Sequence, residues 1–171
     1  MATTAASNGF QKGDWIVHRF HGVGQIRGVE KKKLAGESSR FYRVKTKEST
    51  MWIPVNTLDE ENIRPLATPQ QFGKVLKVFE RPAKEMHDDH NQRKKRINEV
   101  KKHGSLLAVA RLIRDLAARR RENRLNDTED RSMRWFINRL VREWSICKQI
   151  EEAEAERELQ TLIFEEVQSE A

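Results

Sequence analysis

The chain has 171 residues, of which 35% are charged and 37% are hydrophobic. A chain of this length forms one domain or two small ones, and its net charge of +7 favours a polyanion or an acidic protein surface as partner. Its single cysteine, Cys147, excludes an internal disulfide and a multi-cysteine zinc site. We expect a cytoplasmic protein that does not enter a membrane. The first ten residues lack a secretory signal pattern, and no apolar run is long enough to span a bilayer.

The segment from residue 10 to residue 67 predicts four or five short strands. Its runs WIVHR, GQIRGVE, RFYRVKT and MWIPV are rich in β-branched and aromatic residues, and glycine or polar clusters separate them. In the last run Met51, Ile53 and Val55 alternate with Trp52, which is the period of a half-buried strand. Trp52 is therefore expected to face outward. So few short strands fit a small, strongly curved sheet or barrel.

The segment after residue 67 has the spacing of helices. Thr68, Pro69 and Gln71 form a capped helix start. Further helices are expected over about 89–102, after the cap Ser105, after the capping box Asn126–Glu129, and over about 151–167. We expect none of these helices to be stable alone, so they should pack on one another as a bundle.

The sequence therefore predicts an α+β protein of two domains. We expect a disordered start over residues 1–9 and a small β-barrel domain over residues 10–67. An all-α helical bundle with an acidic C-terminal end should follow over residues 68–168.

Charge is sorted within the helical half. Residues 93–124 hold twelve Lys or Arg against three Asp or Glu, whereas residues 151–171 hold eight acidic residues against one arginine. Only Glu99 lies at the i,i+4 spacing that would neutralise the run RKKR within its own helix. This imbalance favours a phosphate-binding patch over an ordinary solvated helix face.

The glycines and histidines of the chain do not point to catalysis. Gly22, Gly24 and Gly28 give GxGxxxG followed by a strand-like run, whereas a dinucleotide loop needs GxGxxG and a helix. A tight turn and a close approach of strands explain these glycines better. The pairs His18/His21 and His87/His90 are too few for a zinc site, and the rings of the first pair are expected to diverge. No catalytic residue, metal or cofactor is predicted.

Several stretches of the chain resemble a known family. FQKGDWIVHRFHGVGQIRGVE, followed by YRVK, MWIPV and IRPL, is similar to the polymerase-interacting domain shared by CarD-type bacterial transcription regulators and transcription-repair coupling factors. The helical half resembles the CarD C-terminal domain in KVLKVFERP, in its basic second helix and in VARLIRDLAARRRENRL. The resemblance thus extends over nearly the whole chain.

The resemblance implies a Tudor-like or SH3-like barrel that binds the β subunit of RNA polymerase by extending one of its sheets. The contact positions of the family fall on Lys32 and Trp52 in this sequence. An outward-facing tryptophan is a good interface anchor. The alternative is that Trp52 packs under the helical half.

The resemblance also implies that the helical half contacts promoter DNA at the upstream edge of the transcription bubble. The phosphate-binding positions fall on the basic run Arg93, Lys94, Lys95 and Arg96. The position of the family's minor-groove tryptophan falls on His90, a departure that offers far less apolar area.

These features predict a non-enzymatic, monomeric regulator of bacterial transcription initiation, associated with the nucleoid through RNA polymerase. It would bind the polymerase β subunit and, largely independently of sequence, promoter DNA, and it would alter open-complex stability. Two alternatives stay open. One is a polymerase-tethered adaptor whose helical half binds another protein, and the other is a free RNA- or ribosome-binding barrel.

Overall fold

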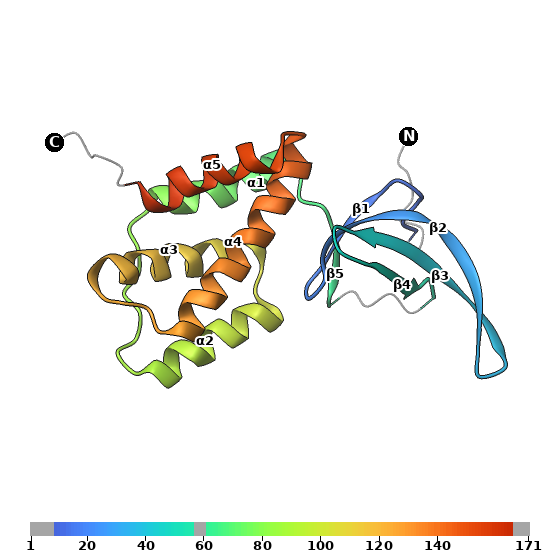
Figure 1. Ribbon diagram of the computed structural model, residues 1–171, viewed down its shortest axis with the longest axis horizontal. Coiled ribbons are helices and arrows are strands. Elements are labelled where there is room, and N and C mark those ends of the chain that lie inside the picture. Colours follow the sequence, from blue (N-terminus) through green and yellow to red (C-terminus); the bar gives the residue numbers. More distant parts are fainter. Residues whose placement is uncertain (1–8, 57–60, 166–171) are drawn as a thin grey trace. The chain divides into compact units, whose positions relative to one another are not determined.

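The chain divides into two units between Leu66 and Ala67. The structure, a computed structural model, describes residues 9–56 and 61–165 (Figure 1). Disorder is expected over residues 1–9, of which only residue 9 is described. The predicted helical position of Val167 also lies outside the described residues. In the described ranges no helix is long and apolar enough to cross a membrane.

The first unit is a five-stranded antiparallel sheet with the strand order β4-β3-β2-β1-β5. Its strands are β1 (Trp15–His18), β2 (Gly22–Leu34), β3 (Glu37–Thr46), β4 (Thr50–Pro54) and β5 (Ile63–Pro65). The structure confirms the predicted strands, although β2 and β3 form a longer hairpin than the sequence runs indicated. Closure of the sheet into a barrel stays a prediction, because β4 and β5 are its two edges.

Alternation along the strands builds the small core of this unit. Six buried side chains form it: Ile16, Ile26, Tyr42, Val44, Ile53 and Ile63. Met51 and Val55 of the MWIPV run pack against this cluster, whereas Trp52 stays 42% exposed. The outward position predicted for Trp52 from the period of its strand is therefore confirmed.

Gly22 and Gly24 serve the turn and the strand approach that their sequence context predicts. Gly22 has a φ of +81° where β2 begins, a backbone region that favours glycine. Gly24 lies so close to β3 that a Cβ on it would be 2.5 Å from Cγ1 of Val44, a fully buried side chain. Both observations agree with the turn and the close strand approach predicted for these glycines.

Gly24 and Gly28 of strand β2 form a matched pair for a stability test. Gly24→Ala should lower the free energy of unfolding by about 1–3 kcal/mol, because a well-packed core does not absorb an extra methyl group. Gly28→Ala is the control, since a Cβ there would meet nothing within 4 Å. Chemical denaturation of both variants tests this, and equal losses would contradict the assigned close approach.

The second unit is all-helical. It contains α1 (Pro69–Leu76), a 3₁₀ turn η1 (Lys77–Glu80), α2 (His90–His103), α3 (Leu106–Glu122), α4 (Asp127–Lys148) and α5 (Glu152–Phe164). The capping boxes predicted at Thr68 and Asn126 are both formed, and Ser105 caps α3 as expected. Because each start signal satisfies backbone N–H groups locally, these helix starts follow from sequence alone.

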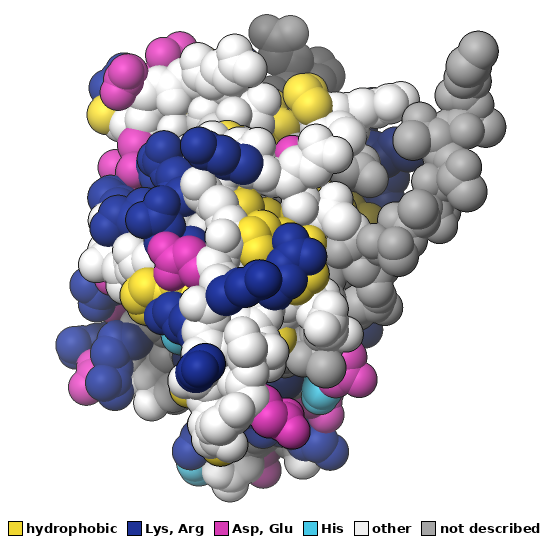
Figure 2. Space-filling model, turned by 90° about the vertical axis from the view of Figure 1, so that its right-hand side faces the viewer, with side chains coloured by type: hydrophobic (Ala, Val, Ile, Leu, Met, Phe, Trp, Pro, Cys, Tyr) yellow, Lys and Arg dark blue, Asp and Glu magenta, His cyan; other side chains and the backbone are white. Residues whose placement is uncertain are grey.

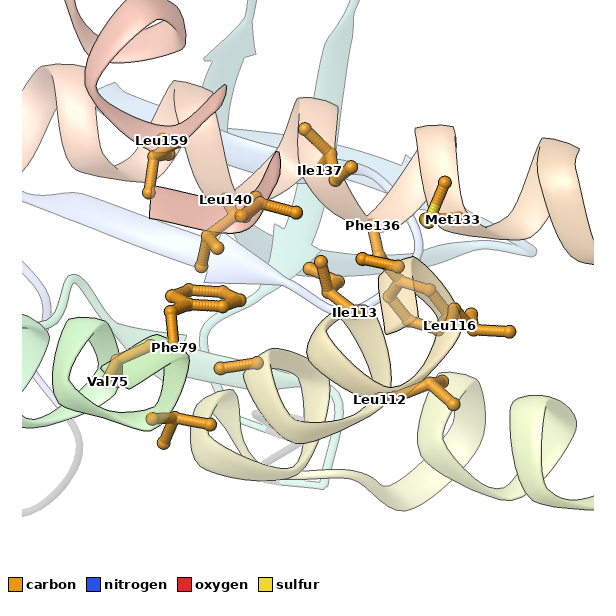
Figure 3. Packing of buried hydrophobic residues seen from close by; sticks show 14 of the residues in the cluster. Val75, Phe79, Leu112, Ile113, Leu116, Met133, Phe136, Ile137, Leu140 and Leu159 are labelled. Atoms are coloured by element: carbon orange, nitrogen blue, oxygen red, sulfur yellow. The ribbon is translucent and has the colours of Figure 1, made fainter. Parts of the chain in front are cut away.

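The core of the second unit lies between α3 and α4, with α1, η1 and α5 against it. Leu112, Ile113 and Leu116 of α3 are 0% exposed, and Figure 3 shows Ile113 and Leu116 on the side of α3 that faces α4. The rings of Phe72 and Trp144 stack with their centroids 4.6 Å apart. The bundle thus depends on interhelical packing, as the amphipathic spacing predicts.

Candidate functional site

The first candidate surface is the outward face of the sheet in the first unit. Nζ of Lys32 lies 3.4 Å from the centroid of the Trp52 ring, a cation–π contact between β2 and β4. The structure therefore brings together the two residues predicted to bind polymerase. Figure 2 shows one face of the molecule on which Lys and Arg side chains lie beside hydrophobic ones.

The position of β4 adds a backbone feature to this surface. β4 is an edge strand, so it presents the backbone edge that strand addition by a partner sheet requires. Trp52 lies in the middle of β4 and pairs with Arg43 of β3. An exposed aromatic anchor and an edge that pairs with no further strand of the described residues thus occur in one five-residue strand.

The second candidate surface is the exposed face of helix α2. An open groove there is lined by Asn91, Lys94, Lys95, Asn98, Glu99, Lys102 and His103. All seven residues belong to one helix, so the groove is a surface depression rather than an enclosed cavity. We call Lys94, Lys95 and Lys102 the lysine strip. Within residues 9–56 and 61–165, none of these three ammonium groups makes an ion pair.

Arg93 does not lie on this exposed face. It is 6% exposed, and its Nε donates to Oε1 of Glu129 at 2.5 Å. Its Nη1 donates to the backbone carbonyls of His87 and Asp88 at 2.9 and 2.6 Å. Arg93 is therefore not grouped with the exposed basic residues, because its guanidinium is buried and its Nε and Nη1 donate inside the unit, and its predicted phosphate contact stays a prediction without support from this geometry.

Arg96 is divided between the interior and the surface. Its Nη2 donates to Oδ2 of Asp115 at 2.7 Å, and its Nη1 contacts Sδ of Met86 at 3.0 Å. Its side chain remains 34% exposed. Asp115 is nearly fully buried and also accepts from Arg114 and from the backbone N–H of Lys84. The predicted DNA contact of Arg96 stays a prediction. Its guanidinium charge is already paired with the Asp115 carboxylate.

His90 is the first residue of α2 and is exposed. Asp89 caps the helix by accepting from the N–H of Asn91 at 2.7 Å. Nδ1 of His87 accepts from the N–H of Asp89 at 2.9 Å, so the HDDH run mainly organises the start of α2. The structure leaves His90 beside the lysine strip on the same helix. Its predicted role at the minor groove stays a prediction.

The other histidine pair differs from the expectation. The rings of His18 and His21 do not diverge, since their centroids are 4.5 Å apart. Nδ1 of His18 accepts from the N–H groups of Phe20 and His21, which closes the turn before β2. Across the described ranges, no three or more His, Cys, Asp or Glu side chains are grouped to hold a metal ion.

Cys147 lies on α4 and is half-buried. Burial raises the pKa of the Cys147 thiol, and the carboxylate of Glu143 raises it further. A thiol with a raised pKa is mostly protonated at neutral pH and is a poor nucleophile.

Two further candidate residues, Glu30 and Trp135, were not predicted from the sequence. Glu30 contacts Trp52 across two strand pairings, which no spacing rule reveals. Trp135 of α4 has Lys101 and Arg139 over its ring, with Nζ at 4.7 Å and Cζ at 4.0 Å from the centroid. Only Trp135 gave a signal in the sequence, as an aromatic residue within a basic helical region.

The Arg93–Glu129 pair gives a stability prediction with a neighbouring control. Arg93→Ala should lower the free energy of unfolding by about 3–5 kcal/mol, because it leaves the Glu129 carboxylate buried without its partner. Lys94→Ala should change it by less than about 0.5 kcal/mol, because Lys94 is exposed. Urea denaturation measures both, and comparable losses would contradict the different roles of these adjacent residues.

Comparison with known proteins matches both units to one family. Residues 10–67 match the CarD-like/TRCF RID domain, which is a polymerase-interacting domain, and residues 74–160 match the CarD C-terminal domain. The Bacillus subtilis (strain 168) protein named "Putative transcription factor YdeB" is 28% identical over 145 residues, covering 84% of this chain and 95% of that protein. The chain therefore belongs to the CarD family, whose members are transcription regulators tied to RNA polymerase.

Proposed function

We propose that this protein is a non-enzymatic, monomeric regulator of bacterial transcription initiation that joins RNA polymerase to promoter DNA. Its first unit binds the polymerase β subunit through Lys32, Trp52 and the edge of β4. Its second unit contacts DNA at the upstream edge of the transcription bubble through α2. The observation that carries the DNA-binding part is the lysine strip, three exposed ammonium groups that make no ion pair within the part of the chain that the structure describes.

Polymerase binding is supported by the chemistry of the first surface. Trp52 offers a large, partly exposed ring on an edge strand, and Lys32 keeps its charge over that ring. Tryptophan is enriched among the residues that dominate interface energies. Strand addition would supply main-chain hydrogen bonds, and the Trp52 ring would supply the side-chain anchor.

DNA binding is supported by the spacing of the lysine strip. Lys94 and Lys102 are eight residues apart in α2, which is about 12 Å along a helix axis. Ammonium groups at this spacing can contact separate phosphates of the DNA backbone without reading bases. His90 would lie at the entry of the helix and would contact the minor groove with less apolar area than a tryptophan.

This arrangement stabilises the open complex by differential binding. A protein held on polymerase by its first unit gains its DNA contacts only where the upstream edge of the bubble is in reach. It therefore binds the open state more tightly than the closed state, and the equilibrium shifts by that difference in affinity.

The lifetime of promoter open complexes after competitor challenge tests the proposal. Holoenzyme with this protein should retain open complexes longer than holoenzyme alone, and Trp52→Ala should remove the difference. An unchanged lifetime with polymerase binding intact would contradict the proposal. It would favour the adaptor alternative, in which the helical unit binds another protein.

The lysine strip makes a quantitative prediction about salt. Changing Lys94, Lys95 and Lys102 together to Ala should reduce the slope of log affinity against log salt by about three, because each phosphate contact contributes about one. Lys74→Ala, an exposed lysine on α1, is the control. The measurement is the DNA affinity of the polymerase-bound protein at several salt concentrations from about 50 to about 200 mM, a range over which phosphate contacts change affinity strongly. If Lys74→Ala reduced the salt slope as much as the triple variant does, the DNA contacts would not be confined to the lysine strip.

A further inference from the structure

Glu30 faces outward with Trp52 and Lys32, and the proposed function leaves it unused. Its Oε2 accepts a hydrogen bond from Nε1 of Trp52 at 2.9 Å. Its Oε1 lies 3.3 Å from Nε of Arg43, whose β3 strand runs between those of Glu30 and Trp52. One carboxylate thus contacts two side chains from the two strands beyond its own.

A β-bulge puts Glu30 on this face. Ile26 pairs with Val44 toward the core, and the register shifts between Ile26 and Gly28. Gly28 then pairs with Arg43, so every second residue after it, including Glu30 and Lys32, faces outward with Trp52. Without the bulge, regular alternation from Ile26 would turn Glu30 and Lys32 toward the core.

The second unit contains the same three residue types around a buried tryptophan, Trp144. Nε1 of Trp144 donates to Oε2 of Glu158 at 2.8 Å, and Nζ of Lys148 lies 5.2 Å from the Trp144 ring centroid. Hydrogen bonds from Lys148 and Trp144 lower the pKa of Glu158, so its carboxylate is favoured in the charged form. There the arrangement fixes a tryptophan that is 7% exposed and stacked on Phe72.

Trp52 differs from Trp144 in what covers its ring. It is 42% exposed, and no aromatic ring of the described residues packs on it. The hydrogen bond to Glu30 and the Lys32 contact nevertheless hold it in one orientation. An anchor held in its binding orientation loses less side-chain entropy on association, which raises affinity.

We propose that Glu30 is a positioning residue for polymerase binding, which holds the Trp52 ring and the Lys32 ammonium ready for the partner. The inference rests on the proposed function and deepens it. Lys32 keeps its N–H donors, because its charge lies over the ring rather than in an ion pair within the described residues. The partner surface that fits is an apolar patch flanked by carboxylate or carbonyl oxygens.

The test compares full-length Glu30→Ala, Glu30→Gln, Trp52→Ala and the Glu30→Ala/Trp52→Ala double variant in binding to RNA polymerase. Glu30→Ala should weaken binding about tenfold, because the Trp52 side chain would then have to be ordered on association. Glu30→Gln should recover most of this, because its amide oxygen can still accept from the indole. The double variant should bind no more weakly than Trp52→Ala.

Glu37→Ala is the matched control, since Glu37 is an exposed carboxylate of the same hairpin. The indole ¹H–¹⁵N resonance of Trp52 gives a readout that needs no polymerase, and Glu30→Ala should shift it whereas Glu37→Ala should not. Unchanged binding of Glu30→Ala, or a further tenfold loss in the double variant, would overturn the positioning role. Failure of the unaltered protein to bind polymerase would instead contradict the proposed function.

Discussion

The buried ion pair between Arg93 and Glu129 fixes the surface on which the DNA-binding proposal depends. Glu129 accepts from Arg93 with one oxygen and from the N–H of Asn126 with the other, so a single carboxylate joins α2 to the capping box of α4. Arg93 also holds the carbonyls of His87 and Asp88, which precede α2. Because this cluster sets the rotation of α2, Lys94 and Lys95 face solvent while Ile97 faces the core. A run of four basic residues is thereby divided between contacts inside the unit and the exposed face of α2.

The candidate surfaces of the two units share one feature, a carboxylate that holds a neighbouring side chain in place. In each, a buried or half-buried carboxylate organises a neighbouring basic or aromatic side chain: Glu129 holds Arg93, and Glu30 holds Trp52. Among the residues proposed to bind partners, Lys32 and the lysine strip make no ion pair within the described ranges. Such groups keep their full attraction for an acidic surface or for phosphate, whereas the paired ones lose most of it.

Local signals in the sequence predicted the strands, helix starts and boundary-forming turns well. Thr68, Ser105 and Asn126 act on backbone groups within four residues, so their effect is readable without a fold. Long-range pairing was not readable. The bulge after Ile26 decides which face carries Glu30, and the contact of Arg93 with Glu129 joins residues 36 apart. The basic run therefore predicts a surface position for Arg93 along with its neighbours, and no pattern in the sequence indicates the contact of Glu30 with Trp52. Family resemblance supplied Lys32, which no pattern in the chain singles out.

Site-specific photo-crosslinking in assembled promoter complexes tests the central claim most directly. A photoreactive residue at position 95 should crosslink to DNA just upstream of the bubble, and one at position 52 should crosslink to the polymerase β subunit. The crosslink from position 95 should require holoenzyme, because weak phosphate contacts act only on a protein already held nearby. DNA crosslinks at position 95 that do not depend on polymerase, or their absence when position 52 reaches the β subunit, would contradict the account.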